Sequence, residues 1–149
     1  MTGPAGLRDP LHIVAIRRRP RPRWRRYLLP GFRPSTYVTA RPVSWNPMDG
    51  KGPVTVPAGF PFDGASVPPV LSWLFPRGHS DYLPAAMIHD WLYATDTGRT
   101  RREADAAFHR ALRRLGVVAA TAWPMWAAVR LGGWLYWRRP PRPLEFHHV

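Results

Sequence analysis

The sequence predicts a mainly α-helical domain with a small β-hairpin, in which two antiparallel helices carry the candidate site and a third helix is apolar. Three observations lead to this fold class. Apolar residues recur at helical spacing from residue 81 onward. Short β-prone runs, TYVTA and PVTVPAGF, precede them. The chain contains no cysteine, which excludes disulfides and thiolate metal sites, so its 149 residues must be held together by packing.

The chain divides into an extended arm over residues 1–35, a single globular domain over residues 36–137 and an extended tail over residues 138–149. The arm holds seven arginines and two prolines between Arg17 and Arg26, which can neither be buried nor form a regular helix. These arginines are Arg17, Arg18, Arg19, Arg21, Arg23, Arg25 and Arg26. We expect the arm either to bind an anionic partner or to be a solvated leader.

The charge of the whole chain favours anionic partners. It has 22 basic and 9 acidic residues, for a formal net charge of +13. Such an excess is typical of proteins that bind nucleic acid, lipid headgroups or acidic protein surfaces. The N-terminus lacks the apolar run of a secretory signal, because LHIVAI is too short, so we expect no signal peptide.

The β-prone runs predict one hairpin. The Asp49-Gly50 step between TYVTA and PVTVPAGF is a turn signal, so we expect these two runs to pair. An irregular loop through FPFDGASVPP should follow, because proline and glycine interrupt any regular element there.

Two amphipathic helices are predicted next. The first starts at Asp81, places Leu83, Met87 and Trp91 on one face, and ends near Gly98. The second begins with a capping box, since Thr100 is followed three residues later by Glu103, and it ends at Gly116. Its apolar stripe is Ala104, Phe108, Leu112 and Leu115, and its solvent face carries Arg102, Arg110, Arg113 and Arg114.

Residues 117–137 form a 21-residue apolar segment with a single charge, Arg130. Its length could span a bilayer, and its tryptophans would suit the membrane interface. The internal charge, Pro124 and the Gly132-Gly133 pair argue against a span. Three interpretations therefore stay open: a buried third helix, an interfacial helix and a transmembrane helix.

One group of polar residues stands out in the two amphipathic helices. His89 and Tyr93 are four residues apart and share a helix face, and Asp105 could turn toward His89 from the next helix. A carboxylate there would fix the imidazole tautomer and make His89 a candidate general base. Asp90, which points away from His89, could share a hard cation with Asp63 and backbone carbonyl oxygens. A core histidine satisfied by a carboxylate explains the same spacing without catalysis.

Three sequence blocks carry a family resemblance. VPAGFPFDGASVP, HDWLY and RREADAAF, in this order, resemble an uncharacterised domain family of tailed phages and prophages over about residues 53–137. The same blocks are similar to the prokaryotic secreted phospholipase A2 pattern. That pattern combines an Asp-Gly-Cys-Ser loop, a Cys-x-x-His-Asp-x-x-Tyr helix and a later Asp-x-x-Phe helix into a calcium-dependent esterase.

The resemblance implies a role for each matching residue. His89 would deprotonate water, Asp105 would orient His89, and Tyr93 would donate its hydroxyl to Asp105. The implied Ca²⁺ ligands are Asp63, the Gly64 carbonyl oxygen and Asp90. The chain departs from the lipase pattern at Ala65 and Ala86, where the lipases have two cysteines that form a disulfide. Such a bridge contributes about 2–4 kcal/mol, so the apolar third helix would have to replace it.

Two functional classes follow from the resemblance. The first is a phage-encoded, calcium-dependent lipid esterase with a His-Asp dyad, held on anionic lipid by arginine and tryptophan. The second is a non-catalytic virion or tail component that uses the same scaffold and the basic arm to bind neighbouring subunits or nucleic acid. The expected location is the virion or the host cytoplasm, with association at a membrane surface left open. A membrane-embedded lysis protein is a third interpretation, and it depends on residues 117–137 alone.

Overall fold

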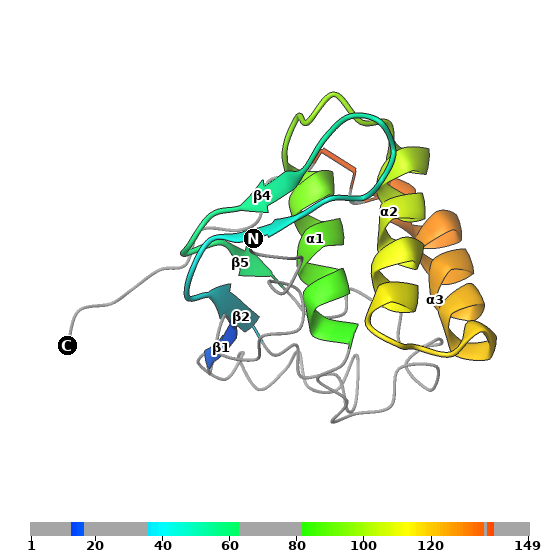
Figure 1. The fold of residues 1–149 in the computed structure, drawn as a ribbon, viewed down its shortest axis with the longest axis horizontal. Helices are drawn as coiled ribbons and strands as arrows, with labels where there is room; N and C mark the ends of the chain where they lie inside the picture. The colour runs from blue at the N-terminus through cyan, green and yellow to red at the C-terminus, as the bar shows by residue number, and fades with distance from the viewer. Residues whose placement is uncertain (1–12, 17–35, 63–81, 136, 139–149) are drawn as a thin grey trace, which may run out of the picture.

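The computed structural model describes residues 13–16, 36–62, 82–135 and 137–138. In this part of the chain three helices lie side by side, with α2 in the middle, and the strands lie next to α1 (Figure 1). The helices are α1 (Leu83–Ala94), α2 (Arg101–Arg114) and α3 (Ala119–Gly132), and a 3-10 turn, η6 (Gly133–Leu135), follows α3. The described residues are thus a mixed α/β arrangement in which helices dominate, and the chain has no cysteine.

Helix α1 confirms the first predicted helix. Pro84 lies in its first turn, where a missing backbone N–H costs no hydrogen bond. Met87, Ile88 and Leu92 are buried in the core. The helix ends at Thr95, whose extended backbone breaks the spiral and whose hydroxyl donates to the carbonyl oxygen of Trp91 at 2.6 Å.

Helix α2 begins and ends as the sequence predicts. The Thr100 hydroxyl accepts a hydrogen bond from the Glu103 backbone N–H, and the Glu103 carboxylate accepts one from the Thr100 backbone N–H, so the capping box is complete. At the other end, Gly116 adopts a φ of 93°, and the Val117 N–H reaches back to the Leu112 carbonyl oxygen at 3.0 Å. This is the Schellman arrangement, which needs a residue without a Cβ at the left-handed position.

Helix α3 is shorter than the apolar segment that contains it. Its inward side chains Ala122, Met125 and Ala128 are buried, and the helix packs against α2. Pro124 lies within the helix, and the helix gives way to η6 at Gly133. Among the described residues, no helix is both long enough and apolar enough to cross a membrane.

The predicted hairpin is partly wrong, because the strand pairing differs. Strand β4 (Val54–Val56) pairs antiparallel with β3 (Val43–Trp45), and the Asp49-Gly50 step lies in the loop between them. The TYVT run is β2 (Thr36–Thr39), which pairs instead with β5 (Pro61–Phe62). The reason is connection length: the turn at Asp49-Gly50 joins the two strands nearest to it, which are β3 and β4.

A third strand extends the second sheet. Strand β1 (Ile13–Ile16) pairs antiparallel with β2, which gives the order β1-β2-β5. It lies within residues 1–35, the range assigned to the arm, so Ile13–Ile16 contributes a strand to the sheet. The seven arginines of the arm and the tail from residue 139 onward lie outside the described residues.

The core is shared by the two sheets and the three helices. In β3 and β4 the apolar residues alternate with exposed ones, so Val43, Trp45, Val54 and Val56 all point inward. Phe60 meets Trp91 of α1 edge to face, with ring centroids 5.0 Å apart. The sheets therefore pack against α1, and α1 in turn packs against α2.

A buried ion pair ties the β3–β4 loop to the helices. The Arg99 guanidinium donates to both carboxylate oxygens of Asp49, at 2.7 and 3.1 Å, and to the Gly52 carbonyl oxygen at 2.7 Å. Both charged side chains are almost completely buried. The hairpin is therefore held in place just ahead of α2, across 50 residues of sequence.

Candidate functional site

His89 and Asp105 lie within hydrogen-bonding distance between the first two helices. The His89 Nε2 atom is 3.0 Å from the Asp105 Oδ1 atom, and both residues are buried. Helix α1 presents His89 toward α2 because His89 lies among its buried residues Met87, Ile88 and Leu92. Asp105 lies on the buried face of α2, beside the apolar residues Ala104 and Phe108. The structure thus brings together the two side chains that the sequence pairs.

Tyr93 belongs to the same cluster. Its hydroxyl donates to the Asp105 Oδ1 atom at 2.5 Å, one helical turn beyond His89. The rings of His89 and Tyr93 are tilted against each other with centroids 4.1 Å apart, and the Phe108 ring lies 5.0 Å from the His89 ring. Aromatic rings therefore flank the imidazole and limit its rotation.

A third helix completes the cluster through Arg130. Its guanidinium donates to the Asp105 Oδ2 atom at 2.7 Å, so both carboxylate oxygens have charged or polar donors. The carbonyl oxygen of Arg130 itself accepts a hydrogen bond from the Arg101 guanidinium at 3.0 Å. One buried carboxylate thus links α1, α2 and α3.

These contacts shift the pKa values in a consistent direction. Burial lowers the pKa of His89, but the hydrogen bond to Asp105 and the charges of Asp90 and Asp105 outweigh burial, so the pKa lies above its usual value. Burial raises the pKa of Asp105, but the three donors outweigh it and hold the pKa below its usual value. Burial and the Asp105 charge raise the pKa of Tyr93, so its hydroxyl keeps its proton. Asp105 is therefore an anion that accepts hydrogen bonds from every partner.

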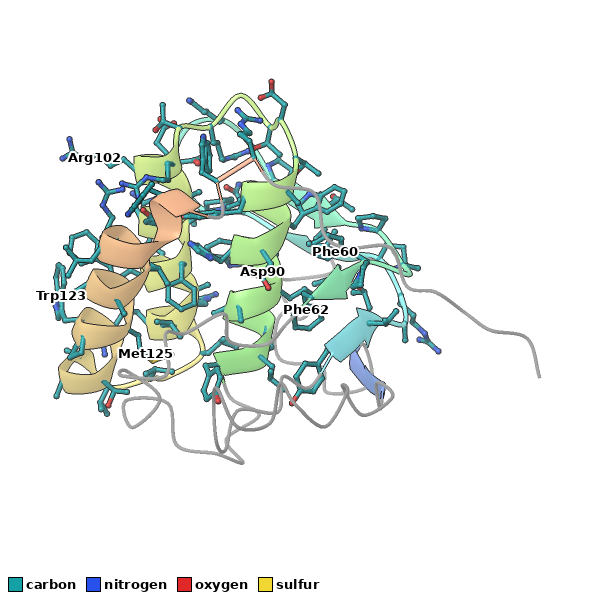
Figure 2. All side chains as sticks on the ribbon, turned by 180° about the vertical axis from the view of Figure 1, so that it is seen from behind. Phe60, Phe62, Asp90, Arg102, Trp123 and Met125 are labelled. Atoms are coloured by element: carbon teal, nitrogen blue, oxygen red, sulfur yellow. The ribbon has the colours of Figure 1, made fainter. Side chains whose placement is uncertain are left out.

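This charge state fixes the tautomer of the neutral imidazole. An ionised carboxylate is only an acceptor, so His89 must carry a proton on Nε2 to bond Asp105. The lone pair of neutral His89 is then on Nδ1. The Nδ1 atom faces α1's own Asp90, whose carboxylate oxygen is 3.9 Å away, too far for a hydrogen bond but near enough to stabilise the imidazolium cation once Nδ1 has taken up a proton. Figure 2 shows Asp90 on α1 near Phe62 of β5.

Of the three predicted cation ligands, the structure describes only Asp90. Ca²⁺ takes six to eight oxygen ligands, mostly carboxylates and carbonyls. The partly exposed Asp90 carboxylate suits such an ion, but Asp63 and Gly64 lie outside the described residues, as does Ala65. Within the described ranges no group of three or more His, Asp or Glu side chains could hold a metal. The calcium site therefore stays a prediction with one described ligand.

Two site residues escaped the sequence reasoning. Arg130 counted only as a charge that argued against a membrane span, yet a lone arginine in an apolar segment must either reach water or find a carboxylate, and Asp105 is that carboxylate. The Gly132-Gly133 pair counted only as an argument against a membrane span, yet Gly133 lies against the Tyr93 ring, where an added Cβ would overlap the hydroxyl. The second contact has no signal in the sequence, because it depends on how η6 returns to α1.

The described fold and site define a class: a small α/β domain in which three helices converge on one buried aspartate that accepts hydrogen bonds from histidine, tyrosine and arginine. The chain belongs to the family described as protein of unknown function (DUF1353), whose family model matches residues 40–129. Both amphipathic helices and most of α3 lie within the match. Comparisons with curated proteins and with solved structures gave no significant match.

Proposed function

We propose that this protein is a lipid ester hydrolase that depends on calcium and uses His89 as its base and Asp105 as the residue that positions it. One observation carries the proposal: the His89 Nε2 atom is bound to a buried, ionised Asp105, which leaves Nδ1 as the proton-accepting atom. A general base needs this arrangement, because the Nε2 atom carries a proton that is bound to the carboxylate while the Nδ1 atom can accept a proton.

The described residues would divide the work as follows. His89 removes a proton from water through Nδ1, and the resulting imidazolium is stabilised by the Asp105 carboxylate at 3.0 Å. Tyr93 holds Asp105 in place by donating to the same oxygen, and Arg130 binds the other oxygen. The water attacks the ester carbonyl carbon, and the proton on His89 then passes to the leaving alcohol as the carbon–oxygen bond breaks.

Calcium enters the proposal through the predicted ligands Asp90, Asp63 and Gly64. When bound there, Ca²⁺ would polarise the ester carbonyl and stabilise the oxyanion. Asp90 supports this part because it lies next to His89 in sequence, with its carboxylate near the nitrogen that accepts the proton. The substrate and the ion would then meet at the same side of α1.

The test is release of fatty acid from phosphatidylglycerol vesicles, with calcium or with chelator. The wild type should release fatty acid only with calcium, and His89→Ala and Asp105→Asn should lose at least about 100-fold. Asp96→Asn is the matched control, because its carboxylate is largely exposed and lies outside the cluster. Equal rates from the wild type and His89→Ala would refute catalysis by His89, and full activity in chelator would refute the need for calcium.

A second function is favoured by a different observation. His89 is only 7% exposed, and Arg130 occupies the second oxygen of Asp105, so the cluster also suits a purely structural role between three helices. We therefore keep as the alternative a non-catalytic phage virion or tail component, whose basic arm binds neighbouring subunits or nucleic acid.

The alternative predicts a different set of results. The wild type should release no fatty acid under any condition, and His89→Ala should lower thermal stability without any loss of function. Replacement of the seven arginines between Arg17 and Arg26 by glutamine, which leaves strand β1 in place, should weaken salt-dependent binding to DNA or to virion proteins. A substituted protein that binds both as the wild type does would exclude a role for the arm.

A further inference from the structure

The outer side of α3 is apolar and exposed. Large apolar side chains that face solvent here are Val118 at 62%, Trp123 at 55%, Leu131 at 78% and Trp134 at 65% exposure. Figure 2 shows Trp123 at the side of α3, and its ring lies beside His109 of α2, with ring centroids 4.4 Å apart. The helix is therefore apolar on both sides, since Ala122, Met125 and Ala128 face α2. We call the exposed side, formed by Val118, Ala120, Trp123, Ala127, Leu131 and Trp134, the α3 outer face.

The spacing shows that this face is one continuous stripe. Ala120, Trp123, Ala127 and Leu131 follow one another at intervals of three, four and four residues, which places them on a single line along a helix. The line contains no charged residue. Arg130 is adjacent in sequence but turns its guanidinium to Asp105. Isolated exposed apolar residues are normal, but a continuous stripe with Trp123 on the helix and Trp134 in the turn that follows it indicates a binding surface.

Positive charge lies at one end of the face. From residue 106 to residue 144 the sequence has seven arginines and no aspartate or glutamate. Arg113 and Arg114 lie exposed at the end of α2, just before Val118, and the Arg113 guanidinium donates to the Val117 carbonyl oxygen at 2.6 Å. Arg138, beyond η6, is instead bound at the end of α1, where it pairs with Asp96 at 3.0 Å. The stripe is thus bordered by positive charge at the end where α3 begins.

We propose that the α3 outer face docks on an anionic lipid bilayer, with α3 lying in the plane of the interface. Tryptophan and leucine would enter the boundary between headgroups and acyl chains, where an amphipathic ring has both an apolar and a polar neighbour. The flanking arginines would meet the phosphates. A 14-residue helix presents about 21 Å of such a surface, too short to cross a bilayer but sufficient to lie on one.

Other occupants fit the face less well. A second copy of the chain would bring Arg113 and Arg114 at the rim close to the same charges of the other copy. Nucleic acid would need arginine or lysine within the stripe to reach phosphates, and Val118 and Leu131 offer neither charge nor hydrogen bonds. A bilayer matches both features, since it is apolar beneath an anionic surface.

The test compares two sets of exposed apolar side chains. We would measure co-sedimentation of the full chain with vesicles of phosphatidylglycerol or of phosphatidylcholine, for the wild type, for Leu131→Gln/Trp134→Gln and for Met48→Gln. Met48 is the matched control, because it is 84% exposed but lies in the β3–β4 loop. Binding to phosphatidylglycerol should exceed binding to phosphatidylcholine and should weaken with salt. The double variant should bind at least about tenfold more weakly, and Met48→Gln should bind as the wild type does.

The opposite results overturn the proposal. Equal vesicle binding by the double variant and the wild type would show that the face does not touch lipid. A concentration-dependent dimer without lipid, abolished in the double variant, would assign the face to a second copy. Loss of DNA binding in the double variant, with vesicle binding unchanged, would assign it to nucleic acid. Because no step requires catalysis, His89→Ala should bind vesicles as the wild type does, so failure of docking and failure of the proposed hydrolase are distinguishable.

Discussion

The backbone of Gly133 lies directly against the phenol ring of Tyr93, at the point where the Tyr93 hydroxyl donates to Asp105. The backbone of Gly133 has ordinary helical angles, so a larger residue would be acceptable to the chain itself. The three atoms nearest to a Cβ at this position all belong to Tyr93, and its hydroxyl oxygen is the nearest of them. Glycine at this position therefore allows α3 and η6 to close over the cluster.

Gly133→Ala should move the Tyr93 hydroxyl away from Asp105 and lower the free energy of unfolding by about 1–3 kcal/mol. Urea denaturation measures the change. Tyr93→Phe is the matched background, because it removes the oxygen that the new Cβ would overlap. The cost of Gly133→Ala should shrink in that background, and equal costs in the two backgrounds would show that the contact with Tyr93 is not responsible.

The buried Asp49–Arg99 pair should be worth far more than the exposed Lys51–Glu103 pair. Arg99→Met leaves the Asp49 carboxylate buried without its cation, so we expect a loss of about 3–5 kcal/mol. Glu103 is paired with Lys51 near solvent, so Lys51→Met should cost about 0–1 kcal/mol. Chemical denaturation of both variants compares them directly. Similar losses of unfolding free energy in Arg99→Met and Lys51→Met would contradict the conclusion that the buried Asp49–Arg99 pair holds the hairpin in place.

His89 should make stability depend on pH near neutrality. Its pKa in the folded protein is above the usual 6.5, so between these two values the folded chain keeps a proton that the unfolded chain has lost. The stability that His89 contributes is therefore complete below pH 6.5 and is lost as pH rises through the folded pKa. The measurement is the difference in free energy of unfolding between the wild type and His89→Gln, which should narrow above pH 6.5. His109, whose pKa is lowered by burial, adds the same pH dependence to the free energy of unfolding of both proteins, so it cancels in the difference. A difference that widens with pH would reverse the assigned sign.

The proposed hydrolase should gain activity as pH rises, because only neutral His89 can accept a proton. The acid limb of kcat/KM should reflect a pKa above 6.5. Arg130→Met removes a positive charge 2.7 Å from Asp105, so the carboxylate should attract the His89 proton more strongly and shift the limb to higher pH. Arg130→Lys keeps the charge and should shift it less. If the acid limb of kcat/KM has the same midpoint pH in Arg130→Met as in the wild type, then Arg130 does not affect the pKa of His89 and serves only to hold α3 in place.

The sequence was most informative where the deciding contacts are local. The capping box at Thr100 and Glu103 and the glycine stop at Gly116 were predicted because their hydrogen bonds join residues only a few positions apart. The meeting of His89 with Asp105 followed from helix periodicity, since two adjacent amphipathic helices place their buried faces together. The catalytic and calcium-binding roles stay predictions.

By itself, then, the amino-acid sequence determined the helices, their caps and the buried faces that unite His89 and Asp105. Only the tertiary structure decided which strand pairs with β4, that Arg130 binds Asp105, and which side of α3 faces solvent. The physical reason is the distance along the sequence between the residues that interact. A cap is settled by hydrogen bonds within one turn, whereas Arg130 and Asp105 are 25 residues apart and Asp49 and Arg99 are 50 apart. Such partners are chosen among many alternatives by the packing of the whole domain.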